Sequence, residues 1–200
     1  SSDGGGRGAF ATGGLFGTVR GNLTAIDSSN YGEITGEDAP GGLGGYVVLS
    51  TFISSSSNAG TISGVSYVGG LVGYSQGGFT VSGSINTGKI EGLDLVGGLI
   101  GLTEAHSSIL DSSNTATISA REIEVGGLVG YSDDSLTIVG SYNTGQISGL
   151  DETGGLVGTV NDSVTIINSM NSGQVSGSNS VGGLMGLQSA RGLAYFENVF

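Results

Sequence analysis

The stretch from Val68 to Tyr74 reads VGGLVGY, and its tripeptide Gly-Gly-Leu decides the fold because it recurs along the whole chain. The tripeptide begins at residues 13, 41, 69, 97, 126, 154 and 182, so the step is 28 residues, and once 29. A period of that size is typical of a solenoid, in which each repeat is one coil stacked on the one before. The sequence therefore predicts a repeat protein of about seven coils.

Two further sequence motifs recur with the same period as Gly-Gly-Leu. One is SYNTGQISG from Ser141, and its copies align six asparagines. The other is a short apolar and β-branched run before each copy, such as LTIV from Leu136. No window keeps the 3.6-residue apolar spacing of an amphipathic helix, so each coil is expected to hold three extended segments separated by glycine and asparagine turns.

These segments predict an all-β fold, a single parallel β-solenoid or β-helix of about seven 28-residue coils with three short strands per coil. At a strand spacing of about 4.8 Å the stack is on the order of 30 Å long. The pattern fits a right-handed or a left-handed solenoid. We expect residues 1–12 to form a lead-in and first partial coil, and residues 13–200 to form one continuous repeat domain.

The repeat sorts apolar residues into columns that are expected to fill the core. One column is Ala25, Ile53, Val81, Ile109, Ile138 and Ile166; a second is Ile34, Ile62, Ile90, Ile118, Ile147 and Val175; the third is Leu15, Leu43, Leu71, Leu99, Leu128, Leu156 and Leu184. The asparagine column is expected to form a ladder at a corner, where stacked carboxamides bond to one another and to turn backbone. Its members are Asn30, Asn58, Asn86, Asn114, Asn143 and Asn171.

One pattern conflicts with a wholly polar exterior. The residue after the leucine of Gly-Gly-Leu is also apolar in six of seven coils. Adjacent strand residues point to opposite faces, so one of the two columns is expected to face outward and to share a face with tyrosines two residues further on. The candidate binding face is Val72, Tyr74, Val129 and Tyr131. The alternative is a glycine bulge that turns both columns inward.

Composition limits the partners. Five basic residues stand against 17 acidic ones, and the net charge of −12 opposes binding to nucleic acid or to an anionic membrane. No apolar stretch of about 18 residues is present, so we expect no membrane insertion. The chain has no cysteine, so its stability has to come from the core and the backbone ladder without disulfides.

The residues also argue against catalysis. His106 is the only histidine, and the chain has no cysteine. The usual Cys-His nucleophile pairs and the transition-metal sites built from several His and Cys ligands therefore lack the residues they need. Paired carboxylates occur at Glu37 and Asp38, at Asp133 and Asp134, and at Asp151 and Glu152, which is typical of solvated loops. We therefore expect neither an enzyme nor a cofactor or metal, with calcium at the acidic turns as the alternative, although no known calcium-loop spacing supports it.

One coil departs from the repeat. Between Asn114 and Gly126 it has one extra residue, within a turn that reads Ala120-Arg121-Glu122-Ile123-Glu124. Insertions in solenoids collect on one face, so this turn is either a protruding binding loop or ordinary drift between repeats.

The word V-G-G-L-V-G-Y, followed by T-I-x-x-S-Y-N-T-G-x-I-S-G, resembles the GLUG-motif repeat of bacterial surface proteins. That family includes haemagglutinin-like adhesins and non-catalytic repeat regions of some secreted peptidases. The resemblance covers nearly the whole chain, with Ser141 and Asn143 standing where family copies often have Cys and Ala. It implies an extracellular stalk or adhesive array and transfers no catalytic residue.

Three functions follow as hypotheses. The first is a non-catalytic adhesin stalk or surface-binding rod, secreted or on a bacterial cell surface, with a cell-surface or glycan ligand. The second is a filament of copies of this chain, because an uncapped solenoid end invites stacking; its candidate end residues are Phe10, Phe16, Phe196 and Phe200. The third and weaker one is an ice-binding face made by the threonine column, which Phe52 and Ser108 interrupt: Thr24, Thr80, Thr137 and Thr165.

Overall fold

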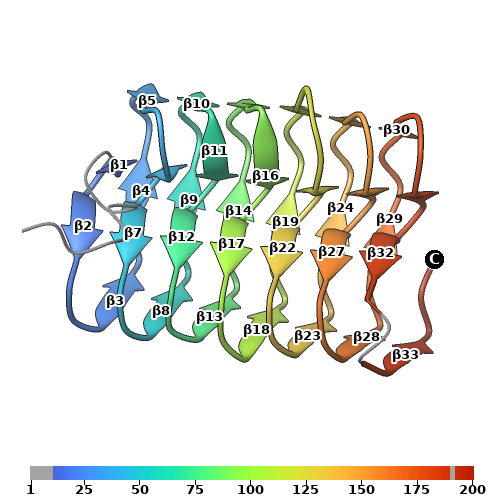
Figure 1. The fold of residues 1–200 in the computed structure, drawn as a ribbon. Coiled ribbons are helices and arrows are strands. Elements are labelled where there is room, and N and C mark those ends of the chain that lie inside the picture. Colours follow the sequence, from blue (N-terminus) through green and yellow to red (C-terminus); the bar gives the residue numbers. More distant parts are fainter. Residues whose placement is uncertain (1–10, 190–191) are drawn as a thin grey trace, which may run out of the picture.

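The computed structural model describes residues 11–189 and 192–200 and confirms an all-β parallel solenoid. The coils lie side by side along one axis, from β1 at one end to β33 at the other (Figure 1). Each strand pairs in parallel with its copy one coil away, and the register is exact in residue type at many positions, as between Asn86 and Asn114. Five parallel sheets run along the stack, and we name them A to E in chain order.

Sheets A, B and C each have seven strands in the described part of the chain. Sheet A consists of β1 (Thr12–Gly13), β6 (Pro40–Gly41), β11 (Ser66–Gly69), β16 (Asp94–Gly97), β21 (Val125–Gly126), β26 (Thr153–Gly154) and β31 (Val181–Gly182). Sheet B consists of β2 (Phe16–Val19), β7 (Gly44–Val47), β12 (Val72–Ser75), β17 (Ile100–Thr103), β22 (Val129–Ser132), β27 (Val157–Val160) and β32 (Met185–Gln188). Sheet C consists of β3 (Leu23–Ile26), β8 (Thr51–Ser54), β13 (Phe79–Ser82), β18 (Ser107–Leu110), β23 (Leu136–Val139), β28 (Val164–Ile167) and β33 (Ala194–Glu197).

Sheets D and E are made of two-residue strands, six in each among the described residues. Sheet D consists of β4 (Ser29–Asn30), β9 (Ser57–Asn58), β14 (Ile85–Asn86), β19 (Ser113–Asn114), β24 (Tyr142–Asn143) and β29 (Met170–Asn171). Sheet E consists of β5 (Ile34–Thr35), β10 (Ile62–Ser63), β15 (Ile90–Glu91), β20 (Ile118–Ser119), β25 (Ile147–Ser148) and β30 (Val175–Ser176).

A full coil therefore has five strands, and the prediction of three was wrong. In two of the three recurring motifs the chain bends at a corner, so that each of these motifs forms two strands instead of one. The glycines of Gly-Gly-Leu separate sheet A from sheet B. The asparagine separates sheet D from sheet E, because its side chain bonds the backbone two residues on: Asn86 Nδ2 donates to Gly88 O at 2.9 Å, and Gly88 N donates to Asn86 Oδ1 at 3.3 Å. This is the local side-chain turn that asparagine favours.

The six asparagines form a ladder through the interior. In every step Nδ2 of one asparagine donates to Oδ1 of the next at 2.8 Å. Asn58, Asn86, Asn114 and Asn143 are fully buried, and each of their Nδ2 groups also has a backbone acceptor. The serines that follow sheet C form a second interior column that also links successive coils. In this column the backbone N–H of one serine donates to the hydroxyl of the next, as from Ser84 N to Ser112 Oγ. The buried groups of these two columns are thereby hydrogen-bonded from coil to coil, as a stable interior requires.

The buried apolar residues form three clusters, of which the two largest fill the inside of the coils. Sheets B and C enclose the larger of these two, with the leucine column and the column of Ile53 and Val81. Sheets E and A enclose the smaller of the two, which includes Ile90 and Val96. The three predicted core columns all point inward, although side chains of the first described coil are less buried, with Leu15 48 % exposed.

Gly-Gly-Leu recurs with the same period as the asparagine because residues of the two motifs are in contact in the folded chain. A Cβ placed on Gly70 would clash with the carbonyl oxygen of Gly98 on the next coil and with the side chain of Asn86. The same clash with an asparagine and the next coil's backbone is found at Gly42, Gly98, Gly127 and Gly155. The second glycine of the tripeptide has to lack a side chain, because the backbone of the next coil and the asparagine ladder occupy the space that a Cβ would need.

We predict that Gly70→Ala lowers the free energy of unfolding by about 1–3 kcal/mol, the usual range for overpacking a close contact. Gly183→Ala is the matched control, because Gly183 holds the same position in the last Gly-Gly-Leu and a Cβ there meets nothing within 4 Å. Urea denaturation of both variants is the measurement. Equal stability of the two variants would contradict the packing argument.

Candidate functional site

The predicted outward face is not formed by the valines. Val72 and Val129 are 0 % exposed and belong to the larger core, as do Leu71 and Leu128. The reason is the corner at Gly-Gly-Leu: the N–H groups of Leu71 and Val72 both donate to the single carbonyl oxygen of Leu99, at 2.9 and 3.0 Å. Two consecutive donors on one acceptor mark a bulge-like bend rather than a flat strand, so both side chains turn inward.

The tyrosines of that face belong to a third apolar cluster, built around the buried Ala39, Tyr74 and Leu102 at sheets A and B. Tyr74 is only 3 % exposed, and its ring stacks on those of Tyr46 and Tyr67 with centroid distances of 4.8 and 5.4 Å. Its hydroxyl donates to Glu104 Oε1. Tyr131 is half-buried two coils further on, beyond Leu102. Val72, Tyr74, Val129 and Tyr131 therefore do not make one accessible surface.

The surroundings of this cluster become acidic toward the C-terminal coils. Glu124 and Glu152 begin the sheet A segment in successive coils, both with positive φ (63° and 48°). Thr159 Oγ1 donates to Glu152 Oε2 at 3.1 Å. Burial, and then the charges of Glu152 and Asp94, raise the pKa of Glu124 to about 7. Burial, and then the hydrogen bond that its hydroxyl donates to Asp133, raise the pKa of Tyr131 to about 12.

The raised pKa of Glu124 predicts a pH-dependent stability. Between about pH 4.5 and 7 the folded chain keeps a proton that the unfolded chain has released, so this contribution is full below pH 4.5 and is lost as pH rises through 7. Glu124→Gln should remove the loss and be more stable than the parent at pH 8, by on the order of 1 kcal/mol because solvent screens a partly buried group.

Urea unfolding at pH 5 and pH 8 measures this difference. The control is Glu33→Gln, which changes an exposed glutamate far along the stack. A stability gain that is the same at both pH values for Glu124→Gln would contradict the assignment.

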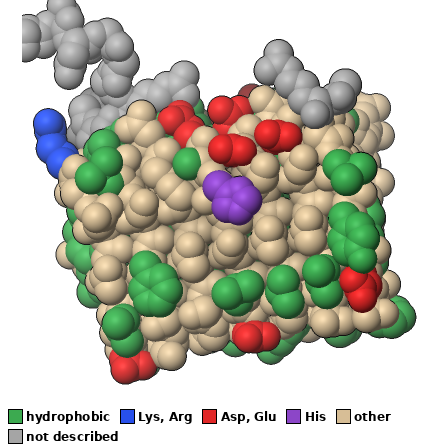
Figure 2. Space-filling view, turned by 90° about the horizontal axis from the view of Figure 1, so that it is seen from below, with side chains coloured by type: hydrophobic (Ala, Val, Ile, Leu, Met, Phe, Trp, Pro, Cys, Tyr) green, Lys and Arg blue, Asp and Glu red, His purple; other side chains and the backbone are tan. Residues whose placement is uncertain are grey.

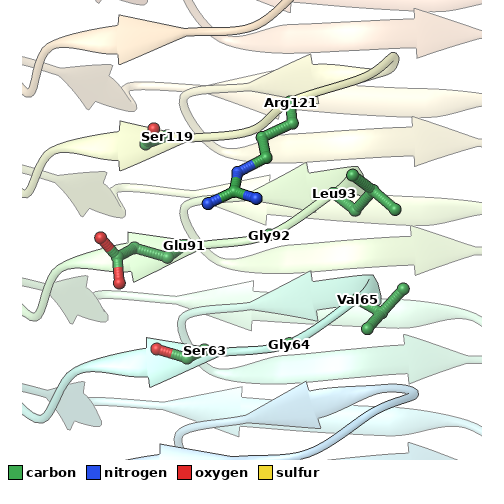
Figure 3. Close-up of a pocket in the computed structure, with 8 residues that line it drawn as sticks. All are labelled: Ser63, Gly64, Val65, Glu91, Gly92, Leu93, Ser119 and Arg121. Atoms are coloured by element: carbon green, nitrogen blue, oxygen red, sulfur yellow. The ribbon is translucent and has the colours of Figure 1, made fainter.

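A shallow cleft lies on the flank where sheet E turns into sheet A. Its volume is about 380 Å³, and Figure 3 shows its lining residues. We call it the Arg121 cleft; its residues are Ser63, Gly64, Val65, Glu91, Gly92, Leu93, Ser119 and Arg121. Three neighbouring strands of sheet E, β10, β15 and β20, supply Ser63, Glu91 and Ser119. The turns that follow supply the rest.

Arg121 is the inserted residue of the fourth coil. Glu122 N donates to Leu93 O at 2.8 Å and Leu150 N donates to Glu122 O at 2.9 Å, so Glu122 occupies the pairing position of Leu93 and Leu150. Arg121 has no counterpart in the other coils. Its side chain runs from its turn across the cleft toward the coil that carries Glu91 and Leu93 (Figure 3). Sequence spacing located this insertion, but it could not show that Ser63, Val65 and Glu91 lie beside it.

The threonine column lies on the outer face of sheet C. It contains Thr24, Thr80, Thr137 and Thr165, with Phe52, Ser108 and Tyr195 in register. Figure 2 shows this face, where hydrophobic side chains form a broken row among polar side chains and backbone. Phe52 and Tyr195 protrude as exposed rings, so the column lacks the even threonine surface that the ice-binding hypothesis needs.

The candidate end-stacking residues lie in different environments. Phe16 is half-buried and packs against the core in the first coil. Phe196 is 42 % exposed and Phe200 is 82 % exposed in the last coil. Phe10 lies outside the described residues.

The acidic pairs show local hydrogen bonds. Asp134 Oδ1 accepts from Ser135 N at 2.6 Å, and Asp151 Oδ1 accepts from Glu152 N at 2.8 Å. Within residues 11–189 and 192–200, no three His, Asp or Glu side chains group in a way that could hold a metal ion. The same residues include no helix with the length and hydropathy to cross a membrane.

The geometry defines the class: a parallel β-solenoid repeat protein whose coils share one interior and differ in their outward side chains. The sequence model of the GLUG motif matches residues 64–91 and 92–119, so the chain contains two consecutive GLUG repeats. Each match contains one complete coil, β11 to β15 in the first and β16 to β20 in the second. A search of the curated proteins finds no significant match.

Proposed function

We propose that this chain is a non-catalytic extracellular segment that acts as an adhesin stalk or surface-binding rod. The observation that carries the proposal is the unbroken in-register pairing of sheets A, B and C across seven coils. Backbone hydrogen bonds and the buried asparagine ladder tie each coil to the next, which favours a stiff body. Such a body holds its lateral side chains in fixed positions for a partner.

The setting is part of the same proposal. GLUG repeats resemble those of bacterial surface proteins, which supports a secreted or cell-surface location and a cell-surface or glycan ligand. The net charge of −12 argues against nucleic acid or an anionic membrane as the partner.

Antibody labelling of intact source cells tests this function, combined with an in-frame deletion of the segment. We expect labelling without lysis and a several-fold loss of adhesion in the deletion strain. A second strain that lacks only residues 149–176 is the matched control, because removing one 28-residue period leaves Ser148 joined to Gly177 in register. It should fold and adhere. Labelling that appears only after lysis would sink the proposal.

The alternative function is a filament of this chain, and the exposed end coils favour it. Leu15 at one end and Phe196 and Phe200 at the other present apolar side chains beside strand edges. Unpaired edges of parallel sheets can accept another chain.

Light scattering and electron microscopy over a concentration series test the filament. Assembly through the ends predicts fibres whose number rises with concentration and which Phe196→Asp abolishes, because the charge would be buried at the junction. Val181→Asp, in sheet A of the same last coil, should act alike, whereas Val65→Asp on the flank should not. A strictly monomeric protein at high concentration rules the filament out.

A further inference from the structure

The Arg121 cleft gathers cationic side chains on an acidic molecule. The described residues include three basic ones, Arg20, Lys89 and Arg121. Arg121 lines the cleft, and Lys89 comes directly before the strand β15 that carries Glu91, while Arg20 comes directly after the first coil's sheet B strand, β2. Lys89 Nζ forms an ion pair with Glu91 Oε1 at 2.5 Å. This pair neutralises Glu91 and leaves the charge of Arg121 in excess at the cleft.

Arg121 has hydrogen-bonding capacity that the protein does not use. The ion pair of Lys89 is the one found among the described residues, so no carboxylate there engages the Arg121 guanidinium. The hydroxyls of Ser63 and Ser119, on either side of Glu91, have no hydrogen-bond partner within that same part of the chain. By contrast, the hydroxyl of Ser176 in the same column donates to Ile147 O at 3.1 Å. The cleft thus offers five guanidinium donors and two hydroxyls to a ligand.

The remaining wall of the cleft is apolar. Val65 is exposed and Leu93 is half-buried at the turns that follow β10 and β15. The volume of about 380 Å³ lies near the lower end of small-molecule sites. A small ligand with an apolar side, several hydroxyls and one anionic group matches this set of surfaces.

We propose that the Arg121 cleft binds a saccharide that carries a carboxylate, such as a uronic acid unit. The Arg121 guanidinium pairs with the carboxylate, because its planar fork matches that group in a two-pronged contact. Ser63, Ser119 and Glu91 bond the sugar hydroxyls, and Leu93 contacts the C–H side of the ring. This assignment names the ligand class for the surface-binding function proposed above and rests on it.

The Glu91 carboxylate distinguishes a sugar from a more highly charged ligand. Its second oxygen, Oε2, accepts hydrogen bonds from sugar hydroxyls but cannot bond the oxygens of a phosphate dianion, which are also acceptors, and the net charge of −12 disfavours a dianion as well. A single carboxylate surrounded by hydroxyls satisfies both Arg121 and Glu91. The ligand is therefore a weakly acidic sugar rather than a nucleotide or a polyphosphate.

NMR titration of the 200-residue chain tests the assignment with three probes. They are a glucuronate-containing disaccharide, a neutral disaccharide of the same size, and acetate. We expect saturable shifts with the first probe alone. Arg121→Ala should weaken its binding at least about tenfold, the scale of a charge-assisted hydrogen bond. Arg20→Ala should leave it unchanged, since it removes an equal charge outside the cleft.

A second pair of variants tests the hydroxyl contacts. Ser119→Ala should weaken binding a few-fold, whereas Ser148→Ala, one strand further along sheet E and outside the cleft, should not. Spectra of the free variants check that each is folded, and all four positions are on the surface.

The overturning results are specific. Equal binding of the neutral disaccharide, equal shifts with acetate, or binding that survives Arg121→Ala would each reject the cleft as an acidic-sugar site. The absence of any shift at 10 mM glucuronate disaccharide, roughly ten-thousandfold above the Kd of a micromolar site, would reject it as well. Adhesion that persists in an Arg121→Ala strain would reject this inference and leave the proposed surface function standing. Labelling only after lysis would reject the surface function without changing the titration.

Discussion

The rest of the structure depends on one constraint: each coil sits directly on the next at the spacing of hydrogen-bonded parallel strands, about 4.8 Å. At that distance each side chain contacts the side chain at the equivalent position of the next coil. An interior position therefore needs a residue type that packs or hydrogen-bonds well against another residue of the same type. Leucine and isoleucine columns bury one another, and asparagines link Nδ2 to Oδ1 through the stack. The second glycine of Gly-Gly-Leu remains bare because the next coil's backbone occupies the place of a Cβ.

The same coil-to-coil spacing underlies the division of the interior into two parts, and it leaves the outward side chains free to differ between coils. The asparagine ladder meets the glycine corner across the coil, and the apolar core lies in two parts, between sheets B and C and between sheets E and A. Outward positions carry no such requirement, so they differ between coils. The side chains between sheets A and B change from stacked tyrosines to neighbouring glutamates, and the cleft on the flank lies at the coil that has an extra residue, Arg121.

The predictions from sequence succeeded where they depended on the repeat itself. The solenoid, its parallel register, the core columns and the asparagine ladder follow from identical residues recurring at one period, since such residues have to stack. The number of strands was wrong, and the direction of the valine column was left open between an outward face and a glycine bulge, because both depend on where the chain bends within a coil. The bend at Leu71 puts two consecutive donors on Leu99 O and turns both Leu71 and Val72 inward, against the alternation of a flat strand.

The sequence by itself determined that this protein is a stack of coils, that the leucine, isoleucine and asparagine columns are interior and which coil is irregular, because a repeat with a fixed period prescribes its own contacts along the axis. Only the tertiary structure decided what lies side by side around each coil. The packing of Tyr74 between Tyr46 and Tyr67, and the grouping of Arg121 with Ser63, Glu91 and Ser119, join residues whose neighbourhood depends on the bends between sheets. Those bends come from backbone hydrogen bonds at corners, which no periodicity in residue type records.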